Sequence, residues 1–276
     1  MRPHKKIEAI NALFRTTLAG GYGADKPWSA VRYLRLHGNR FIFEKAAAWC
    51  VSQNPHKRAR GADILCQLQG PKQAAQRSVP GFHPPPPIFV QESFEILSRL
   101  VTNEPDEQAL FSALFGLGHL YEEAAVPLLI PFANHPSDVV RFAVACSLGH
   151  FSGNSAAVEA LIPLTADSDV DVRDWATFAV GTQSDADTPE LREALYRRLD
   201  DKSSKVREGA IAGLAKRKDV RAVVPLFKLM QRGSYFVCHD HDFEALVDAD
   251  ESDNDWGPDE FIDALYAKFP ELLPAR

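Results

Sequence analysis

The sequence has few of the features that mark secreted or membrane-spanning proteins. No apolar run approaches the ~20 residues that cross a bilayer, and residues 1–8 contain no apolar core of a signal peptide. The cysteines, Cys50, Cys66, Cys146 and Cys238, do not follow the spacing of a disulfide framework. Three of them lie in apolar helical runs, where a free cysteine acts as a small hydrophobic side chain. We therefore expect a cytoplasmic protein that does not enter a membrane.

Motifs of catalysis and metal binding are also scarce. The chain has no glycine-rich phosphate-binding loop and no nucleophile elbow. Residues 238–242 are of zinc-ligand type, but neighbours in sequence cannot all turn toward one ion, and no second Cys/His group follows at a useful spacing. Residues 248–255 have the composition of a calcium loop but lack the glycine and the glutamate that an EF-hand needs. We expect no metal, no cofactor and no enzymatic activity.

The chain does contain a repeat. Residues 137–149, 168–181 and 203–215 each place Ser or Asp before a Val-Arg pair, and an apolar run follows. The arginines of these pairs are 32 and 34 residues apart. A period in this range is typical of one supersecondary element stacked on copies of itself. Such stacks usually work by presenting a surface rather than a catalytic pocket.

Each repeat is predicted to be a pair of helices. Ser or Asp is a good N-cap for the second helix, and apolar residues then recur at helical spacing. His119 and His150 follow equivalent Leu-Gly pairs, so we expect both to cap helix C-termini. We expect Pro127, Pro163 and Pro225 in the first turns of first helices. The first helices are predicted at residues 126–132, 158–164, 191–199 and 223–229.

Looser copies extend the array toward both ends. Helix pairs are predicted at about residues 39–69, 88–119, 122–150, 154–182 and 188–217, and a degenerate copy at 219–249. A C-terminal cap helix is predicted at 258–269. The terminal copies of a stack must be atypical because one of their faces meets water. N-terminal capping helices are predicted at 3–37, with inward-facing side chains at Ile7, Ile10, Leu13, Phe14 and Leu18.

The repeated Asp-x-x-Val-Arg-x-x-Ala-x-x-x-Leu-Gly pattern resembles the HEAT-like repeat over roughly residues 39–232. The resemblance implies an all-α fold, an α-solenoid of HEAT-like helix pairs. The domains are then capping helices at 1–38, an array at 39–232 with a proline-rich insertion at 70–87, and an acidic C-terminal part at 233–276. The resemblance also implies a structural ladder in which Arg141, Arg173 and Arg207 pair with turn acids of their own or the next repeat, namely Asp138, Asp169 and Asp171.

Charge is distributed unevenly along the chain. Residues 1–80 hold fourteen Lys and Arg against four acids, whereas 81–276 hold seventeen against thirty-three. Eleven acids and no Lys or Arg lie within 233–267. Such a segment attracts a basic partner; the alternative is a solvated acidic loop that keeps the end of the stack soluble.

Trp175 stands out among the second helices. The equivalent residues are Ala143 and Gly209, so the core does not require a large ring at this place. Trp175 follows Asp174 on the opening turn of its helix, and Trp is a favoured anchor in protein interfaces. Partner contact and simple packing both remain open from the sequence.

A narrower resemblance concerns function. Residues 172–180, 185–192 and 206–221 resemble a bacterial HEAT-repeat group, some members of which are immunity proteins for Rhs-type polymorphic toxins. The resemblance implies a non-catalytic cytoplasmic inhibitor, a monomer that binds one basic toxin domain 1:1 and binds neither membrane nor nucleic acid. The predicted partner-binding residues are Asp174, Trp175, Glu208, Asp240, Asp242, Glu244, Asp248, Asp250, Glu251, Asp253, Asp255 and Trp256.

Two alternatives stay open. One is a generic assembly scaffold without a toxin partner. The other is an enzyme on the same scaffold, such as a DNA-alkylation glycosylase or a bilin lyase. The basic N-terminal third would supply a phosphate-binding face, but the acidic C-terminal half argues against it. A di-iron hydroxylase is excluded because none of the nine histidines precedes a glutamate.

Overall fold

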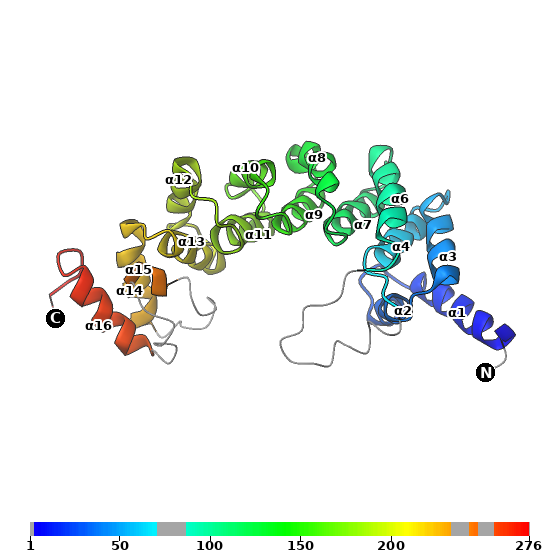
Figure 1. Cartoon of the computed structure of the whole chain (residues 1–276), viewed down its shortest axis with the longest axis horizontal. Helices are drawn as coiled ribbons and strands as arrows, with labels where there is room; N and C mark the ends of the chain where they lie inside the picture. Colours follow the sequence, from blue (N-terminus) through cyan, green and yellow to red (C-terminus); the bar gives the residue numbers. More distant parts are fainter. Residues whose placement is uncertain (1–2, 71–86, 233–242, 248–256, 276) are drawn as a thin grey trace. The chain divides into compact units, whose positions relative to one another are not determined.

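The computed structural model describes residues 3–70, 87–232, 243–247 and 257–275, which form helices and turns without a β-strand. The predicted all-α solenoid of helix pairs is confirmed (Figure 1). The chain divides into two compact parts, unit 1 (Met1–His150) and unit 2 (Phe151–Arg276). This division falls inside the array predicted at 39–232, and the predicted boundaries at 38 and 232 stay predictions.

Unit 1 contains the N-terminal helices and the first helix pairs. The second helices of the pairs, α4, α7 and α9, pack on one another in that order. Gly118 of α7 permits the closest approach, because a Cβ there would lie 2.7 Å from the Cα of Ser147 in α9. The helices are α1 (Pro3–Thr17), α2 (Asp25–Leu36), α3 (Arg40–Cys50), α4 (Pro55–Leu65), α6 (Val90–Thr102), α7 (Glu107–Gly118), α8 (Val126–Leu129) and α9 (Asp138–Gly149).

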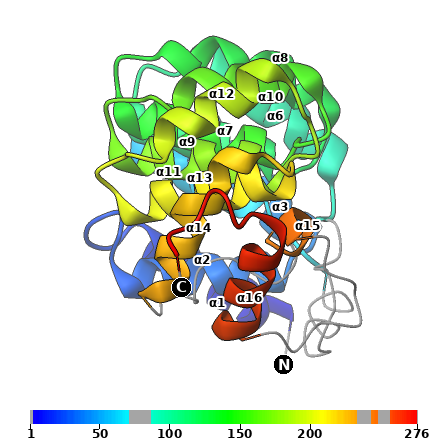
Figure 2. The ribbon, with the colours of Figure 1, turned by 90° about the vertical axis from the view of Figure 1, so that its left-hand side faces the viewer.

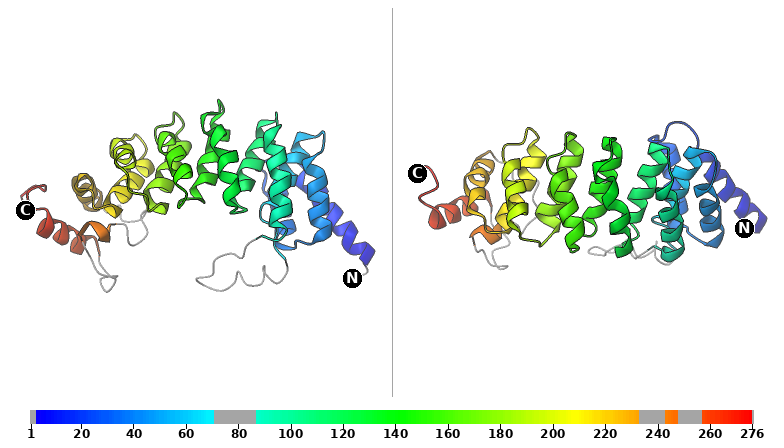
Figure 3. Two further views of the ribbon diagram at one scale, coloured as in Figure 1. Left: turned by 45° about the horizontal axis from the view of Figure 1, so that its top comes forward. Right: turned by 90° about the horizontal axis from the view of Figure 1, so that it is seen from above.

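Unit 2 continues the same construction. The first helices α10 and α12 lie on one side of the pairs, and the second helices α11 and α13 lie on the other (Figures 1 and 3). The helices are α10 (Ser155–Leu164), α11 (Val170–Phe178), a π-helical turn (Ala179–Gln183), α12 (Pro189–Arg198), α13 (Ser204–Lys216), α14 (Val223–Gln231), α15 (Glu244–Val247) and α16 (Pro258–Lys268).

Local sequence explains where the second helices begin. Asn54, Asp106 and Asp169 hold the N-cap positions of α4, α7 and α11, and each accepts hydrogen bonds from backbone N–H groups of the first turn. Ser137 and Ser203 occupy the same position before α9 and α13 but make no side-chain cap bond. The predicted starts are therefore confirmed, although two serines do not act as predicted.

The arginine of the Val-Arg pair closes the turn that precedes its helix. Arg141 donates to the two carbonyls of this turn at 2.8 and 3.0 Å. Arg58, Arg173 and Arg207 make the same two bonds in their own turns. Arg173 also pairs with Asp201 of the following turn at 3.0 Å, so this contact forms part of the predicted ladder.

The acid partner of Arg173 differs from those predicted in its own repeat. The Asp169 carboxylate caps α11 instead, accepting from the N–H groups of Asp171 and Val172. Asp201 lies 28 residues beyond Arg173 and is nearly buried. The ion pair therefore joins successive repeats instead of closing one repeat on itself.

A buried ionic network joins the N-terminal segment to α4 and α7. Arg60, which is fully buried, donates to the carbonyls of Thr17 and Tyr22 at 3.0 and 2.6 Å and to the Asp63 carboxylate at 3.1 Å. The Tyr22 hydroxyl donates to Asp63 at 2.7 Å and shares a hydrogen bond with Ser112, also at 2.7 Å. Burial, with the Asp63 carboxylate nearby, raises the pKa of Tyr22. The network fixes the α1–α2 loop on the first pairs.

The inward-facing side chains predicted for the N-terminal helix are only partly correct. Ile10 and Phe14 are buried, and Leu13 and Leu18 are half-buried. Ile7 is 45% exposed, so its predicted inward orientation is wrong. It lies one turn before Ile10 in α1, and the packed stretch of that helix begins only at Ile10.

Pro163 is not in a first turn as predicted. Asn154 caps α10, which therefore begins at Ser155 and places Pro163 next to its last residue. Pro127 and Pro225 do lie at the starts of α8 and α14.

At the C-terminal end, α16 closes the described part of unit 2. It packs on α14 and α15, as Figure 2 shows. Phe227 of α14 and Tyr266 of α16 meet edge to face at 5.4 Å, and Leu265 is fully buried. The cap helix predicted at 258–269 is therefore present.

The cysteines of the described residues pack as small apolar groups. Cys50, Cys66 and Cys146 are free and buried. Burial raises the pKa of the Cys66 thiol to about 11 and that of Cys146 to about 12. The prediction that three cysteines act as hydrophobic side chains is confirmed. Cys238 lies outside the described residues.

Candidate functional site

The exposed side of α11 and α13 carries three of the predicted partner-binding residues, Asp174, Trp175 and Glu208. Phe178 lies one turn beyond them on α11. The Trp175 and Phe178 rings are each 42% exposed and stand edge to face, with centroids 6.0 Å apart. We call Asp174, Trp175, Phe178 and Glu208 the acidic–aromatic patch.

Trp175 stays at the surface because the core side of α11 is made by other residues. Val172 and Ala176 are fully buried, whereas Trp175 has small counterparts in the neighbouring second helices. One of these counterparts is Gly209, where a Cβ would lie 3.4 Å from Cγ2 of Thr177. This is an ordinary van der Waals distance, so a small side chain fits at this position of α13. The large ring of Trp175 is therefore not required by packing between the helices.

The carboxylates of the patch influence one another. Burial raises the pKa of Asp174, Asp171 raises it further, and Lys205 opposes the shift. Burial also raises the pKa of Glu208. The Arg207 charge lowers this pKa, and the Asp174 charge raises it further. Two partly desolvated carboxylates on adjacent helices favour a cation placed between them, because the cation relieves their mutual repulsion.

The backbone beneath the patch is held by close helix packing. A Cβ on Gly213 of α13 would lie 2.6 Å from the Cα of Gly181, so these helices meet at the glycine backbones. Gly181 belongs to the π-helical turn that follows α11. The π turn changes the direction of the chain, so carbonyls at its end lack the usual helical partner.

Arg217 satisfies these carbonyls. Its guanidinium is 7% exposed and donates to five backbone oxygens at 2.7 to 2.9 Å. The acceptors belong to Val180, Gly181, Ser184, Ala186 and Gly213. Arg217 thus ties the π turn after α11, and the segment that follows it, to α13. The sequence analysis missed this residue, since a basic residue after a helix ordinarily faces solvent.

The other predicted partner-binding residues are not brought to the patch by the described structure. Glu244 begins α15, and its side chain is not among those described. The remaining residues lie outside the described part of the chain: Asp240, Asp242, Asp248, Asp250, Glu251, Asp253, Asp255 and Trp256. Their role stays a prediction.

The described residues contain no group of three or more His, Cys, Asp or Glu side chains that could hold a metal ion. The Cys-His-Asp-His-Asp segment at 238–242 lies outside them. Within the same described ranges, every helix is too short or too polar to cross a membrane.

Asp174 and Glu208 occupy the same position in their repeats, and this position holds phenylalanine in two second helices of unit 1. The fifth residue after the N-cap is Phe111 in α7 and Phe142 in α9, but Asp174 in α11 and Glu208 in α13. The Phe111 and Phe142 rings stack with centroids 6.4 Å apart and planes 6° from parallel. The same repeat position is therefore aromatic in α7 and α9 and acidic in α11 and α13, whereas in α4 it holds the buried Ala59.

The aromatic row of unit 1 continues along its helices. Phe115 lies 5.7 Å from Phe111 and 4.4 Å from His119, and His119 lies 4.8 Å from His150. Both histidines are C-caps, as predicted. Burial lowers the pKa of His119 to about 4 and also lowers that of His150, so both are neutral at pH 7. The sequence analysis missed this row, although phenylalanines four and thirty-one residues apart were its signal.

Known proteins share this architecture. A sequence profile of HEAT repeats matches residues 95–181 and 158–241. Protein YibA of Escherichia coli (strain K12) is 26% identical over 230 residues, which span 81% of this chain and 75% of YibA. The X-ray structure of E. coli YibA has a TM-score of 0.69 at 23% identity and covers 98% of this chain and 97% of that one. An engineered protein has a TM-score of 0.52 at 16% identity, covering 82% and 96%. These structural likenesses show the fold, and the sequence match shows that the chain belongs to the HEAT repeat family.

Proposed function

We propose that this HEAT-repeat chain is a non-catalytic protein-binding scaffold that holds one basic protein partner on the acidic–aromatic patch. The observation that carries the proposal is the patch itself: two exposed aromatic rings beside two partly buried carboxylates of raised pKa. Aromatic side chains supply contact area, and the carboxylates select a Lys or Arg side chain of the partner. The helix-paired scaffold is itself compatible with protein binding.

The proposed partner is a cognate toxin domain of the Rhs type, which this chain would block in the cytoplasm as an immunity protein. Support comes from the resemblance of residues 172–180, 185–192 and 206–221 to that immunity group. The surface is preformed on packed helices, so little ordering entropy is lost on binding. Toxin domains that act on nucleic acids are often basic, which suits the two carboxylates of the patch.

Co-purification identifies the partner. The tagged chain is recovered from its native cells, and the proteins that accompany it are identified by mass spectrometry. One toxin domain in 1:1 ratio is the expected result. A mixture of housekeeping proteins would instead support the generic scaffold, and absence of any partner would overturn the proposed binding function.

Substitutions in the patch then test the binding face. Trp175→Ala combined with Asp174→Asn is expected to weaken binding of the partner about 1000-fold, since two interface anchors that contribute about 2 kcal/mol each sum to about 4 kcal/mol. Tyr33→Ala removes an aromatic ring of similar exposure, 47%, from α2 in the other unit, and serves as the matched control. If the patch variant and the control bind the partner with equal affinity, the interface does not lie on α11 and α13.

A further inference from the structure

Cavities recur between the first helices of successive pairs. One of about 460 Å³ lies between α3 and α6, one of about 330 Å³ between α10 and α12, and one of about 400 Å³ between α12 and α14. The fold creates such grooves wherever ridges of neighbouring helices do not fully interlock. We call the third the α12–α14 groove; its polar lining is Tyr196, Asp200, Arg207, Arg221, Lys228 and Arg232.

The three grooves differ in charge. The groove between α10 and α12 is lined by two glutamates and two arginines, and that between α3 and α6 by two arginines and one glutamate. The α12–α14 groove has four cations against the single carboxylate of Asp200. It also lies in the part of the chain, 81–276, where acids outnumber Lys and Arg by thirty-three to seventeen. The fold therefore does not require this positive charge, and the surrounding composition does not explain it.

Two of the cations are held in place by other groups. Arg221 donates to Asp219 at 2.6 Å, pairs with Glu193 at 3.3 Å and lies 4.7 Å from the centroid of the Tyr196 ring. Arg207 donates from Nη1 to the carbonyls of residues 201 and 202. Their positions are set before any ligand arrives.

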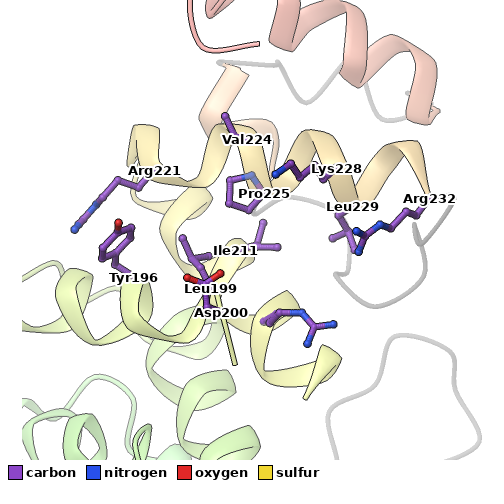
Figure 4. Close-up of a pocket in the computed structure, with 11 residues that line it drawn as sticks. Tyr196, Leu199, Asp200, Ile211, Arg221, Val224, Pro225, Lys228, Leu229 and Arg232 are labelled. Atoms are coloured by element: carbon purple, nitrogen blue, oxygen red, sulfur yellow. The ribbon is translucent and has the colours of Figure 1, made fainter. Parts of the chain in front are cut away.

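The other two cations are exposed and close together. Lys228 lies in the last turn of α14 and Arg232 is the C-cap that follows the helix, and both line the groove (Figure 4). Among the described residues, no carboxylate lies within 4.0 Å of either side chain. The helix dipole favours positive charge at this end of α14, but like charges at this spacing repel each other by a few tenths of a kcal/mol, which a bound anion would relieve.

The floor of the groove is apolar. Ile211 of α13 and Val224, Pro225 and Leu229 of α14 line it, and the Tyr196 ring stands beside Arg221 at one end (Figure 4). A ligand with both an anionic group and an apolar body would use both parts of this lining.

We propose that the α12–α14 groove binds a small phosphate monoester with an apolar body. The dianion would lie against Lys228, Arg232 and Arg207, because guanidinium groups match phosphate oxygens in pairs and a double charge suits several cations better than a single carboxylate does. The apolar body would lie on Ile211 and Leu229. The site does not rest on the partner-binding proposal, since it takes a ligand of opposite charge and its exposed cations stand at the end of α14, although α13 contributes Arg207 to the groove and Glu208 to the patch.

Isothermal titration calorimetry of the full chain with phenyl phosphate tests the site. Saturable binding with a Kd of about 1 mM or tighter is expected, with weaker binding of inorganic phosphate, which lacks the body, and of benzoate, which lacks the second charge. Lys228→Gln with Arg232→Gln should weaken phenyl phosphate binding at least tenfold. As the control, Lys5→Gln with Lys6→Gln removes two exposed charges from α1 in the other unit and should leave phenyl phosphate binding unchanged.

The proposal would be overturned by the absence of saturation with phenyl phosphate, or by equal affinities of the α14 and α1 double variants. Equal affinity for benzoate and phenyl phosphate would reject the phosphate as the recognised group. Trp175→Ala should bind phenyl phosphate as the unaltered chain does, so loss of the protein partner and loss of the phosphate site are distinguishable.

Discussion

Replacing Arg217 by methionine removes the guanidinium that joins the π turn after α11, and the segment that follows it, to α13. Methionine keeps much of the apolar length of the side chain, so the change mainly deletes the donors. Five backbone carbonyls lose a charged partner, and the positions of at least Val180 and Gly181 are buried. We expect unit 2 to become markedly less stable while its helices remain formed under native conditions.

The magnitude follows from the carbonyls that water cannot reach. A buried acceptor left without a partner costs about 1–3 kcal/mol. With two carbonyls stranded and the others rehydrated, the free energy of unfolding should fall by about 4 kcal/mol. A loss of this size corresponds to a decrease of about 10 °C in Tm for a domain of this length.

Urea and thermal unfolding followed by circular dichroism at 222 nm measure the change. Arg197→Met is the matched control, because Arg197 lies on the neighbouring α12, is 68% exposed and makes a single contact with Glu193 at 3.0 Å. An exposed pair of this kind contributes about 0.5 kcal/mol or less. A loss below about 1 kcal/mol for Arg217→Met would refute the reasoning, since the five carbonyls would then have other partners in the variant.

Two further predictions concern packing and pH. Gly213→Ala should lower the free energy of unfolding in urea by about 2 kcal/mol, because the new Cβ would lie 2.6 Å from the Cα of Gly181. Gly153→Ala is the control and should leave stability unchanged, because its Cβ would meet nothing within 4 Å. A neutral Gly213→Ala would disprove the close backbone contact. Burial lowers the pKa of His119 from 6.5 to about 4, so stability should be full above pH 6.5 and fall as the pH drops to about 4. The decrease should reach about 3 kcal/mol, and in His119→Gln the slope of stability against pH over this range should be clearly shallower.

The helix pairs could be predicted because their signals are local. N-cap residues such as Asn54, Asp106 and Asp169 stand a fixed number of positions before an apolar run, and the cap bond forms within one turn of the chain. Pro163 shows the limit of this reasoning. It was assigned to a first turn from the apolar run alone, whereas the cap at Asn154 starts the helix earlier.

The buried ionic network could not be predicted for the opposite reason. Tyr22 reaches Asp63 and Ser112 across 41 and 90 residues of sequence, and no spacing rule connects such positions. Arg60 and Asp63 looked like polar interruptions of an apolar helix. Only the packing of the α1–α2 loop on α4 and α7 shows that they satisfy each other and the backbone.

The candidate site was partly predictable. The small counterparts of Trp175 in the repeated helices indicated that the core does not require a large ring there, but only the structure shows that the residue is exposed. Phe178 was missed because it continues an apolar run that, in α9, is buried. The mutual effect of Asp174 and Glu208 depends on the distance between two helices, which the repeat period alone does not specify.

The side chain at the fifth position after the N-cap can change in the second helices without a change in the helix pair. The scaffold holds its helices with caps, turn-closing arginines and small residues, and none of these occupies that position in α7, α9, α11 or α13. Phenylalanine, aspartate and glutamate all stand there without altering the helix pair around them. New partners can therefore be acquired by exchanging side chains at this one register, while the stability of the stack is determined elsewhere.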